Sequence, residues 1–176
     1  MSRPDWMLPE ISELTEFPVD RIAKQLGALC RYAGATPDHY SVARHSLLVV
    51  SLLPEDPAVR LLGLIHDAHE CWTGDLLRPA TKRLGPALSV YQDECDAKLW
   101  KLLGLDPHVD QLNAVAAADS QACLLEMRLL GKSINDVSHE ISCDQNALWH
   151  LMFHGNSRID AQHWREEFYK LVNSVG

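Results

Sequence analysis

Apolar residues recur every three to four positions along most of this chain, the spacing that places them on one face of an α-helix. Alternating runs of β-branched residues, which would indicate strands, are few. The segment SVARHSLLVVSLL, residues 41–53, is a clear example of the helical pattern, with Ser41 as a capping residue and Pro54 at its end. The pattern predicts an all-α protein.

Proline, glycine and capping residues divide the rest of the pattern into further segments. We expect helices over residues 20–34, 57–73, 86–103, 107–130 and 157–175. Residues 76–84 contain Pro79 and are expected to be irregular, and residues 132–148 are too mixed and polar for an assignment. No repeat or linker divides the chain, which predicts a single domain.

The composition is that of an ordinary globular domain, with 47% apolar and 23% charged residues among 176. The net charge of −8, without a basic stripe, argues against nucleic acid as a partner. A small anionic substrate stays open, because a metal or a few local cations can reverse the field in one pocket. The apolar stretches are too short for a membrane span. Five scattered cysteines and no leader pattern predict reduced thiols and a cytoplasmic protein.

The segment GLIHDAHECWTGD, residues 63–75, ends an apolar run with two imidazoles and two carboxylates. His66 and Glu70 are four residues apart and share a face of the expected helix, as do His66 and His69. Asp67 points about 100° away from His66 around the axis, yet both can reach one ion beside a helix end. The order HxxHE is not the HExxH of zinc proteases. Taken alone, the segment fits either an exposed helix end or a built site.

Two more polar residues lie in apolar helices. His45 is on the apolar side of its helix, where a lone histidine is commonly a core residue, and its neighbour Arg44 is expected to be a surface charge. Asp119 lies within NAVAAADSQACLL, where an acid is costly unless it is paired or bound to a metal. Together with His66-Asp67 they provide two imidazoles and two carboxylates. This set suits zinc, manganese, iron, cobalt or nickel, and leaves coordination positions for water and a phosphate oxygen.

The order His45 … His66-Asp67 … Asp119 resembles the H…HD…D signature of the HD-domain phosphohydrolases, over about residues 20–131. The string HDAHECWTGDLLRPATK is similar to the HDxxExxxGD…P…K segment of small bacterial HD-domain 5′-deoxynucleotidases. CRYAG…YSVARHS is similar to short phage-type HD proteins, a group that includes dATP triphosphohydrolases. The resemblance implies a compact HD-type helical bundle over residues 1–176, in which residues 132–176 form a C-terminal helical segment.

Carried over by position, the resemblance implies a divalent transition metal such as zinc, cobalt or manganese, and allows a second metal such as magnesium. Glu70 matches the acid that orients or deprotonates the attacking water, and Asp75 matches a second carboxylate near the leaving group. The metal ligands implied are His45, His66, Asp67 and Asp119.

The resemblance also implies substrate contacts. Arg31, fourteen residues before His45, matches an arginine that holds phosphate, and Lys82 matches a phosphate-binding lysine. His69 is an alternative to Asp75 as the partner of the leaving oxygen, and Trp72 is a candidate contact for the base.

The function expected from these residues is a metal-dependent deoxynucleotide phosphohydrolase, with a preference for dATP cleaved to deoxyadenosine and triphosphate. A 5′-deoxynucleotidase acting on deoxynucleoside monophosphates is the nearest alternative. A non-catalytic nucleotide-binding HD protein and a purely structural bundle are the others. The expected partner is a small nucleotide, with neither nucleic acid nor a membrane involved, and the chain is expected to form a homodimer or a larger ring such as a hexamer, in the host cytoplasm if a phage encodes it.

Overall fold

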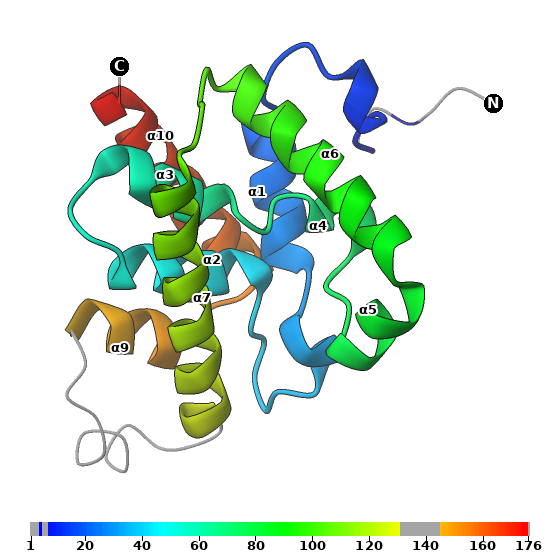
Figure 1. Cartoon of the computed structure of the whole chain (residues 1–176). Helices are drawn as coiled ribbons and strands as arrows, with labels where there is room; N and C mark the ends of the chain where they lie inside the picture. Colours follow the sequence, from blue (N-terminus) through cyan, green and yellow to red (C-terminus); the bar gives the residue numbers. More distant parts are fainter. Residues whose placement is uncertain (1–3, 5–6, 131–144, 176) are drawn as a thin grey trace.

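The computed structural model describes residues 4, 7–130 and 145–175, and in these ranges the protein is helical (Figure 1). The extended pairing found there is one isolated bridge between Cys30 and Ser41. The all-α prediction is therefore confirmed. The helices are α1 (Val19–Ala28), α2 (Val42–Leu52), α3 (Pro57–Ile65), α4 (Glu70–Thr73), α5 (Arg78–Leu84), α6 (Pro86–Leu102), α7 (Val109–Leu129), α9 (Gln145–Met152) and α10 (Ser157–Val175), with the short 3-10 turns η1 (Ile11–Glu13) and η2 (Arg31–Gly34).

Helix α2 lies at the centre of the fold. The side chain of Ser41 caps it by accepting the backbone N–H of Arg44 at 3.1 Å, as the sequence predicts. Every residue from 42 to 50 is buried, and α2 contacts α1, α3, α7, α9 and α10. A helix that is covered on all sides must be apolar nearly all round. A polar side chain at its middle therefore needs a partner.

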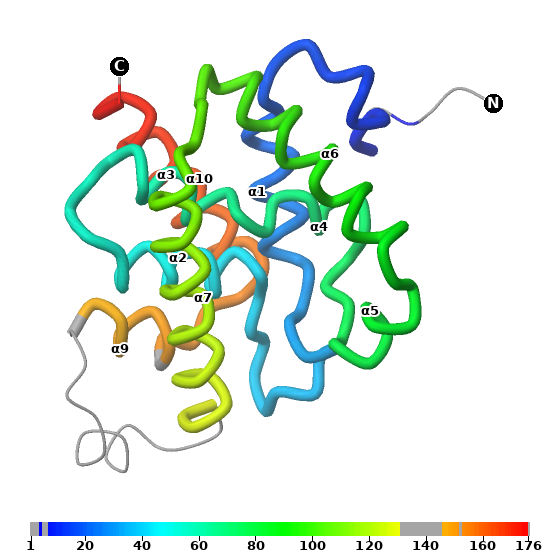
Figure 2. Tube along the Cα trace, viewed as in Figure 1, coloured from blue at the N-terminus to red at the C-terminus, as the bar shows by residue number. Residues whose placement is uncertain are grey.

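Two clusters of apolar side chains pack on different sides of α2. One contains residues of α1, α3, α6 and α10, including the buried Trp164 and Leu99. The other joins α2 and α3 to α7 and α9. Figure 2 shows that several segments of the chain pass next to α2. In this view the α3–α4 connection runs between α6 and α7. This arrangement leaves the end of α3 between two long helices.

Three expected elements differ from the structure. The first helix stops at Ala28, because Leu29 and Arg31 form backbone hydrogen bonds with Val42 and Tyr40 instead of continuing the helix. The helix expected over 57–73 breaks after Ile65 and resumes as α4. Residues 78–84 are helical, because Pro79 lies in the first turn of α5, where proline is tolerated.

The remaining helices agree with the sequence. Helices α6 and α10 match the ranges 86–103 and 157–175, and α7 begins two residues later than expected, at Val109. The unassigned range 132–148 lies outside the described residues apart from the start of α9. Across residues 4, 7–130 and 145–175, no helix combines the length and apolar character that a membrane crossing needs.

Arg44 is buried, so the expectation of a surface charge is wrong. Its guanidinium lies 3.0 and 3.1 Å from the two carboxylate oxygens of Asp160 on α10. The same carboxylate accepts the hydroxyl of Ser41 at 2.7 Å. This buried ion pair attaches α10 to the start of α2.

We expect Asp160→Asn to destabilise the protein by about 3–5 kcal/mol, because it leaves the buried Arg44 charge without a counter-charge. Urea unfolding followed by circular dichroism measures the change. The matched control is Asp20→Asn, which breaks a pair of exposed side chains with Arg165 and should cost no more than about 1 kcal/mol. Equal losses in the two variants would contradict a stabilising role for the buried pair.

Candidate metal centre

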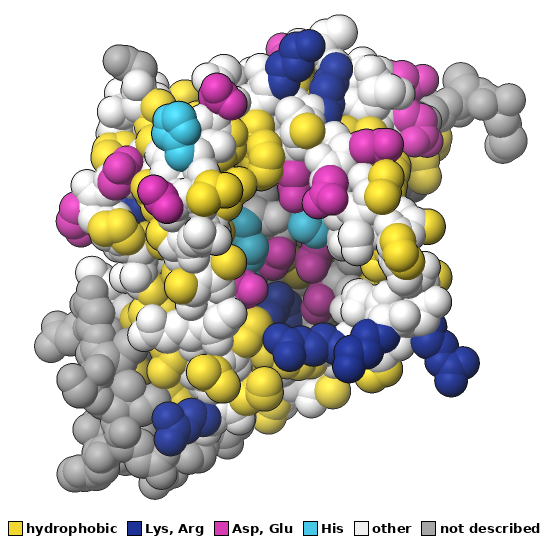
Figure 3. Space-filling model, viewed as in Figure 1, with side chains coloured by type: hydrophobic (Ala, Val, Ile, Leu, Met, Phe, Trp, Pro, Cys, Tyr) yellow, Lys and Arg dark blue, Asp and Glu magenta, His cyan; other side chains and the backbone are white. Residues whose placement is uncertain are grey.

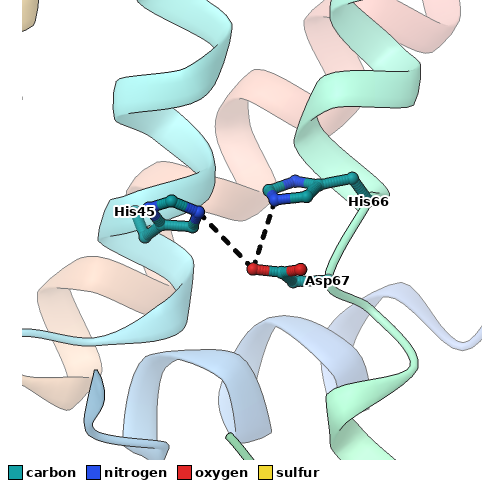
Figure 4. Close-up of side chains that lie close together, drawn as sticks. All are labelled: His45, His66 and Asp67. Carbon is teal, nitrogen blue, oxygen red and sulfur yellow. Dashed lines mark ion pairs between the residues drawn. The ribbon is translucent and has the colours of Figure 1, made fainter. Parts of the chain in front are cut away.

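Two imidazoles and a carboxylate converge at the centre of the fold (Figure 4). His45 projects from the middle of α2, and His66 and Asp67 follow directly after α3. The Nε2 atoms of His45 and His66 lie 3.5 and 3.2 Å from the same oxygen of Asp67, Oδ2. All three residues contribute a ligand atom to one group small enough to surround a metal ion.

The orientation of both imidazoles is set at Nδ1. The Nδ1 of His66 lies 2.8 Å from the carbonyl oxygen of Gly63, and the Nδ1 of His45 lies 2.6 Å from a carboxylate oxygen of Glu126. Both partners are acceptors, so each Nδ1 carries the proton that it donates. The two Nε2 atoms are buried and make no hydrogen bond, although carboxylate oxygens lie nearby. A cation can therefore bind at these two Nε2 atoms in place of protons, and a held Nδ1–H is the usual state of a metal-binding histidine.

Asp119 reaches the same point from α7. Its Oδ1 lies 3.1 Å from Nε2 of His45 and 3.9 Å from Nε2 of His66. Ligand atoms that share one cation at about 2.1 Å are roughly 3.0–3.4 Å apart. The contact with His45 lies within this range and the contact with His66 is longer, and the donors come from three separate parts of the chain. The structure therefore places Asp119 beside the group of His45, His66 and Asp67, which by itself is the tighter one.

Two neighbouring residues of the site lie in a turn that follows α3. In a regular helix His66 and Asp67 would diverge by about 100°. Residues 66–69 instead form a turn, and the N–H groups of Ala68 and Glu70 bond three residues back, to Ile65 and Asp67. The side chains of His66 and Asp67 nevertheless approach each other to 3.2 Å, between Nε2 and Oδ2. The expected continuous helix, on which His66 would share a face with His69 and Glu70, is interrupted by this turn.

The site is strongly polarised without a cation. Burial lowers the pKa of His66, but the charge of Asp67 outweighs it and raises that pKa to about 9. The pKa of His45 is also raised, against burial, by Asp119 and Glu126. Burial raises the pKa of Asp67, but the neighbouring imidazoles of His66 and His45 outweigh burial and hold that pKa well below the usual range. The carboxylates thus favour positive charge at this point, and either a proton on each imidazole or one divalent cation supplies it.

A second group of ligand atoms lies next to the first and shares Asp67 with it. Its other members are His69 and Glu70. Oε2 of Glu70 is buried and makes no hydrogen bond. Burial, and then the charges of Asp67 and Asp75, raise the pKa of Glu70 to about 9. Without a cation, Glu70 is therefore a carboxyl that keeps its proton close to the metal ligands, and it is a candidate ligand for a second cation.

Arg31 and Asp75 lie beside the metal centre, and both are held there by the turn η2. The guanidinium of Arg31 is 3.6 Å from Asp67 and 3.2 Å from Glu126, and these carboxylates keep its pKa high despite burial. Asp75 accepts the backbone N–H of Tyr32 at 3.2 Å. Tyr32 and Ala33 have φ of 56° and 53°, left-handed values that cost energy in non-glycine residues. The strained turn aims Arg31 inward.

The other expected contacts lie outside the group of His45, His66 and Asp67. The Nδ1–H of His69 donates to the carboxylate of Asp96 on α6 at 3.0 Å. The indole N–H of Trp72 donates to the carbonyl of Pro9, and its ring packs against the apolar core, so the structure does not place it among the ligand atoms. Lys82 is exposed on α5. Figure 3 shows a hollow between α6 and α7, with histidine and acidic side chains on its floor and Lys and Arg side chains along its edge over α5.

The sequence reasoning missed two acids at this site. Glu126 lies seven residues after Asp119 on α7, and residues seven apart share a helix face, so a search of that face would have found it. Asp96, the partner of His69, lies in a helix with several other acidic residues and gives no comparable signal.

Fold and site together define an all-α protein with a candidate metal centre of two histidines and two aspartates. No family model matches the chain. It is similar to the uncharacterized protein YfdR of Escherichia coli strain K12, with 34% identity over 113 residues, 64% of this chain and 61% of that protein. It is also similar to an uncharacterized protein of Rhodobacter capsulatus, with 32% identity over 120 residues, 63% of this chain and 61% of that one. The similarity thus spans less than two thirds of each relative, and neither relative has an assigned activity.

Proposed function

We propose that this protein is a metal-dependent phosphohydrolase of the HD-domain superfamily that acts on deoxynucleotides. The observation that carries the proposal is the pair of buried, unbonded Nε2 atoms of His45 and His66 facing the carboxylates of Asp67 and Asp119. A purely structural bundle gives no reason for two orphaned nitrogens and two acids at its centre, because buried polar atoms without partners are destabilising.

The residues around the ligands fit a hydrolytic role. A divalent cation held by the four ligands would lower the pKa of a water molecule and stabilise charge developing on a phosphate. Glu70 has a buried oxygen without a hydrogen bond, and with a cation bound nearby to lower its raised pKa it would accept the proton of that water. Arg31 binds a phosphate oxygen at the opposite side of Asp67. Asp75 and His69 are both candidates for the proton needed by the leaving oxygen.

The charges around the site also explain why a cation must bind before a phosphate does. Around the site, five carboxylates surround one guanidinium, that of Arg31. A phosphate would be repelled by this set, whereas a divalent cation reverses the local field. The carboxylates are Asp67, Glu70, Asp75, Asp119 and Glu126. We expect zinc, cobalt or manganese at the four-ligand group, and a second metal such as magnesium at the group shared by Asp67, His69 and Glu70.

A triphosphate is the favoured substrate. Arg31 is the single cation in contact with the ligand group among the described residues, and it suffices for one phosphate. The basic residues of α5, Arg78, Lys82 and Arg83, are exposed, and Figure 3 shows Lys and Arg side chains over α5 at the edge of the hollow, where further phosphates would extend. We propose dATP on the basis of the sequence resemblance, with cleavage to deoxyadenosine and triphosphate. The homo-oligomeric state and the cytoplasmic location expected from the sequence belong to the same proposal.

The test is to identify the phosphate species released by the metal-loaded protein. With cobalt or manganese present, dATP should give deoxyadenosine and inorganic triphosphate, separated by ion-exchange chromatography. The four dNTPs and the four dNMPs are compared at equal concentration, and protein stripped with a chelator is the control.

Release of orthophosphate from dNMPs alone would replace the proposal with the 5′-nucleotidase alternative. Binding of dNTPs without turnover, under every metal tried, would replace it with a nucleotide-binding protein. Absence of both binding and turnover would leave no support for a nucleotide site.

A further inference from the structure

Glu126 is a fully buried carboxylate that joins the metal side and the phosphate side of the site. It lies on α7 and has no exposed surface. Four side chains meet it, from two parts of the chain far from it in sequence. The partners are Arg31, Tyr32, Tyr40 and His45. So dense a set of donors on one buried carboxylate needs a reason beyond apolar packing.

One oxygen of Glu126 acts on the metal side. Its Oε1 accepts Nδ1–H of His45 at 2.6 Å and the hydroxyl of Tyr40 at 2.9 Å. His45 is completely buried, so its ring has no solvent to orient it. The hydrogen bond fixes the tautomer and turns Nε2 toward Asp67 and Asp119. A carboxylate behind a ligating histidine also makes the histidine a stronger donor to the metal.

The other oxygen acts on the phosphate side. Its Oε2 lies 3.2 Å from both Nε and Nη2 of Arg31 and accepts the hydroxyl of Tyr32 at 2.6 Å. Tyr32 belongs to the left-handed part of η2, so this contact helps hold a strained backbone in place. With Nε and Nη2 engaged on one edge, the guanidinium presents Nη1 toward Asp67, at 3.6 Å.

We propose that Glu126 is a positioning residue that orients the metal ligand His45 and the phosphate-binding Arg31 through its two oxygens. This inference rests on the proposed function, because it assigns Glu126 a role only if the four-ligand group binds a cation and Arg31 binds phosphate. Asp119 lies two turns earlier on α7, so one helix supplies both a ligand and the group that orients another ligand.

The test uses the full chain and two probes, Co²⁺ and inorganic phosphate. Cobalt binding is followed by the visible absorption of the ion, and phosphate binding by the change in that absorption at saturating cobalt. In Glu126→Gln we expect cobalt affinity to fall 10–100-fold. Phosphate affinity at saturating cobalt should fall as well, because Arg31 loses the counter-charge that orients it.

The matched control is Asp160→Asn, the same carboxylate-to-amide change at a buried site that holds a different arginine, Arg44. It lowers stability without touching the site, and both affinities should stay within about twofold of those of the unchanged protein. Circular dichroism of the metal-free proteins establishes that each variant is folded. Equal losses of affinity in both variants would show a general effect of destabilisation and would overturn the proposal.

Three other results separate the inference from the proposed function. If the unchanged protein shows no cobalt spectrum, the metal centre itself is wrong. If it binds cobalt and Glu126→Gln matches it in both affinities, or loses only one of them, the joint role of Glu126 is wrong. If Glu126→Gln does not fold, proton NMR of the unchanged protein decides. A protected imidazole proton on Nδ1 of His45, shifted downfield by the short bond to Glu126, supports the role, and its absence overturns it.

Discussion

Replacing Asp67 by asparagine is expected to abolish metal binding and phosphate-ester hydrolysis together. The Oδ2 atom of Asp67 contacts three side chains, at 3.2 Å from His66, 3.5 Å from His45 and 3.6 Å from Arg31. Asp67 also belongs to both groups of ligand atoms. Loss of a residue that only supports a ligand costs 10–100-fold in metal affinity. Loss of this shared ligand should therefore cost more than about 100-fold.

Titration with cobalt and assay of dATP cleavage measure the two effects. Asp93→Asn removes the same charge from an exposed position on α6 and should change neither result. Circular dichroism of the metal-free Asp67→Asn protein checks that the helices are retained. A folded variant that kept either cobalt binding or full activity would remove the proposed centre, because both groups of ligand atoms contain this carboxylate.

Two of the four candidate ligands were recognisable from the sequence because each is a polar residue in a helix whose other positions are largely apolar. His45 on the buried α2 and Asp119 in an alanine-rich stretch of α7 stand out for this reason, and the structure brings them together. The turn at His66–His69 was not predictable, because the pattern of residues 57–73 fits a continuous helix equally well.

Buried ion pairs were the other failure of prediction. Arg44 and Asp160 are 116 residues apart, and Arg31 and Glu126 are 95 apart. Local sequence carries no signal for pairing over such distances, so a charged residue on a helix is assigned to the surface by default. Expecting Arg44 at the surface followed that rule. The helical period indicates a buried charge in one case, where the neighbours of the charged residue on the same helix face are apolar, as for Glu126.

The second prediction concerns Glu70 and separates an enzyme from a binding protein. Glu70→Gln is expected to lower kcat by about 10²–10⁴-fold, the usual contribution of a general base. Cobalt affinity at the four-ligand group should change little, because Glu70 is not one of the four. The amide has nearly the shape of the carboxyl. With its pKa raised to about 9, that carboxyl is protonated near neutral pH in the metal-free protein, so the variant should fold normally.

Single-turnover cleavage of dATP gives the rate of the chemical step, and equilibrium binding of dATP to the cobalt-loaded variant gives its affinity. Glu70 is 9% exposed and lies close enough to Asp67 and Asp75 for their charges to raise its pKa. It is the one carboxylate of α4, so this helix offers no replacement for it. A hydrolytic site predicts slow cleavage with retained dATP binding. Unchanged cleavage would show that the proton is taken elsewhere and would transfer that role to Asp75 or His69. Loss of cobalt and dATP binding together would instead make Glu70 a ligand, the role that the group shared by Asp67, His69 and Glu70 allows.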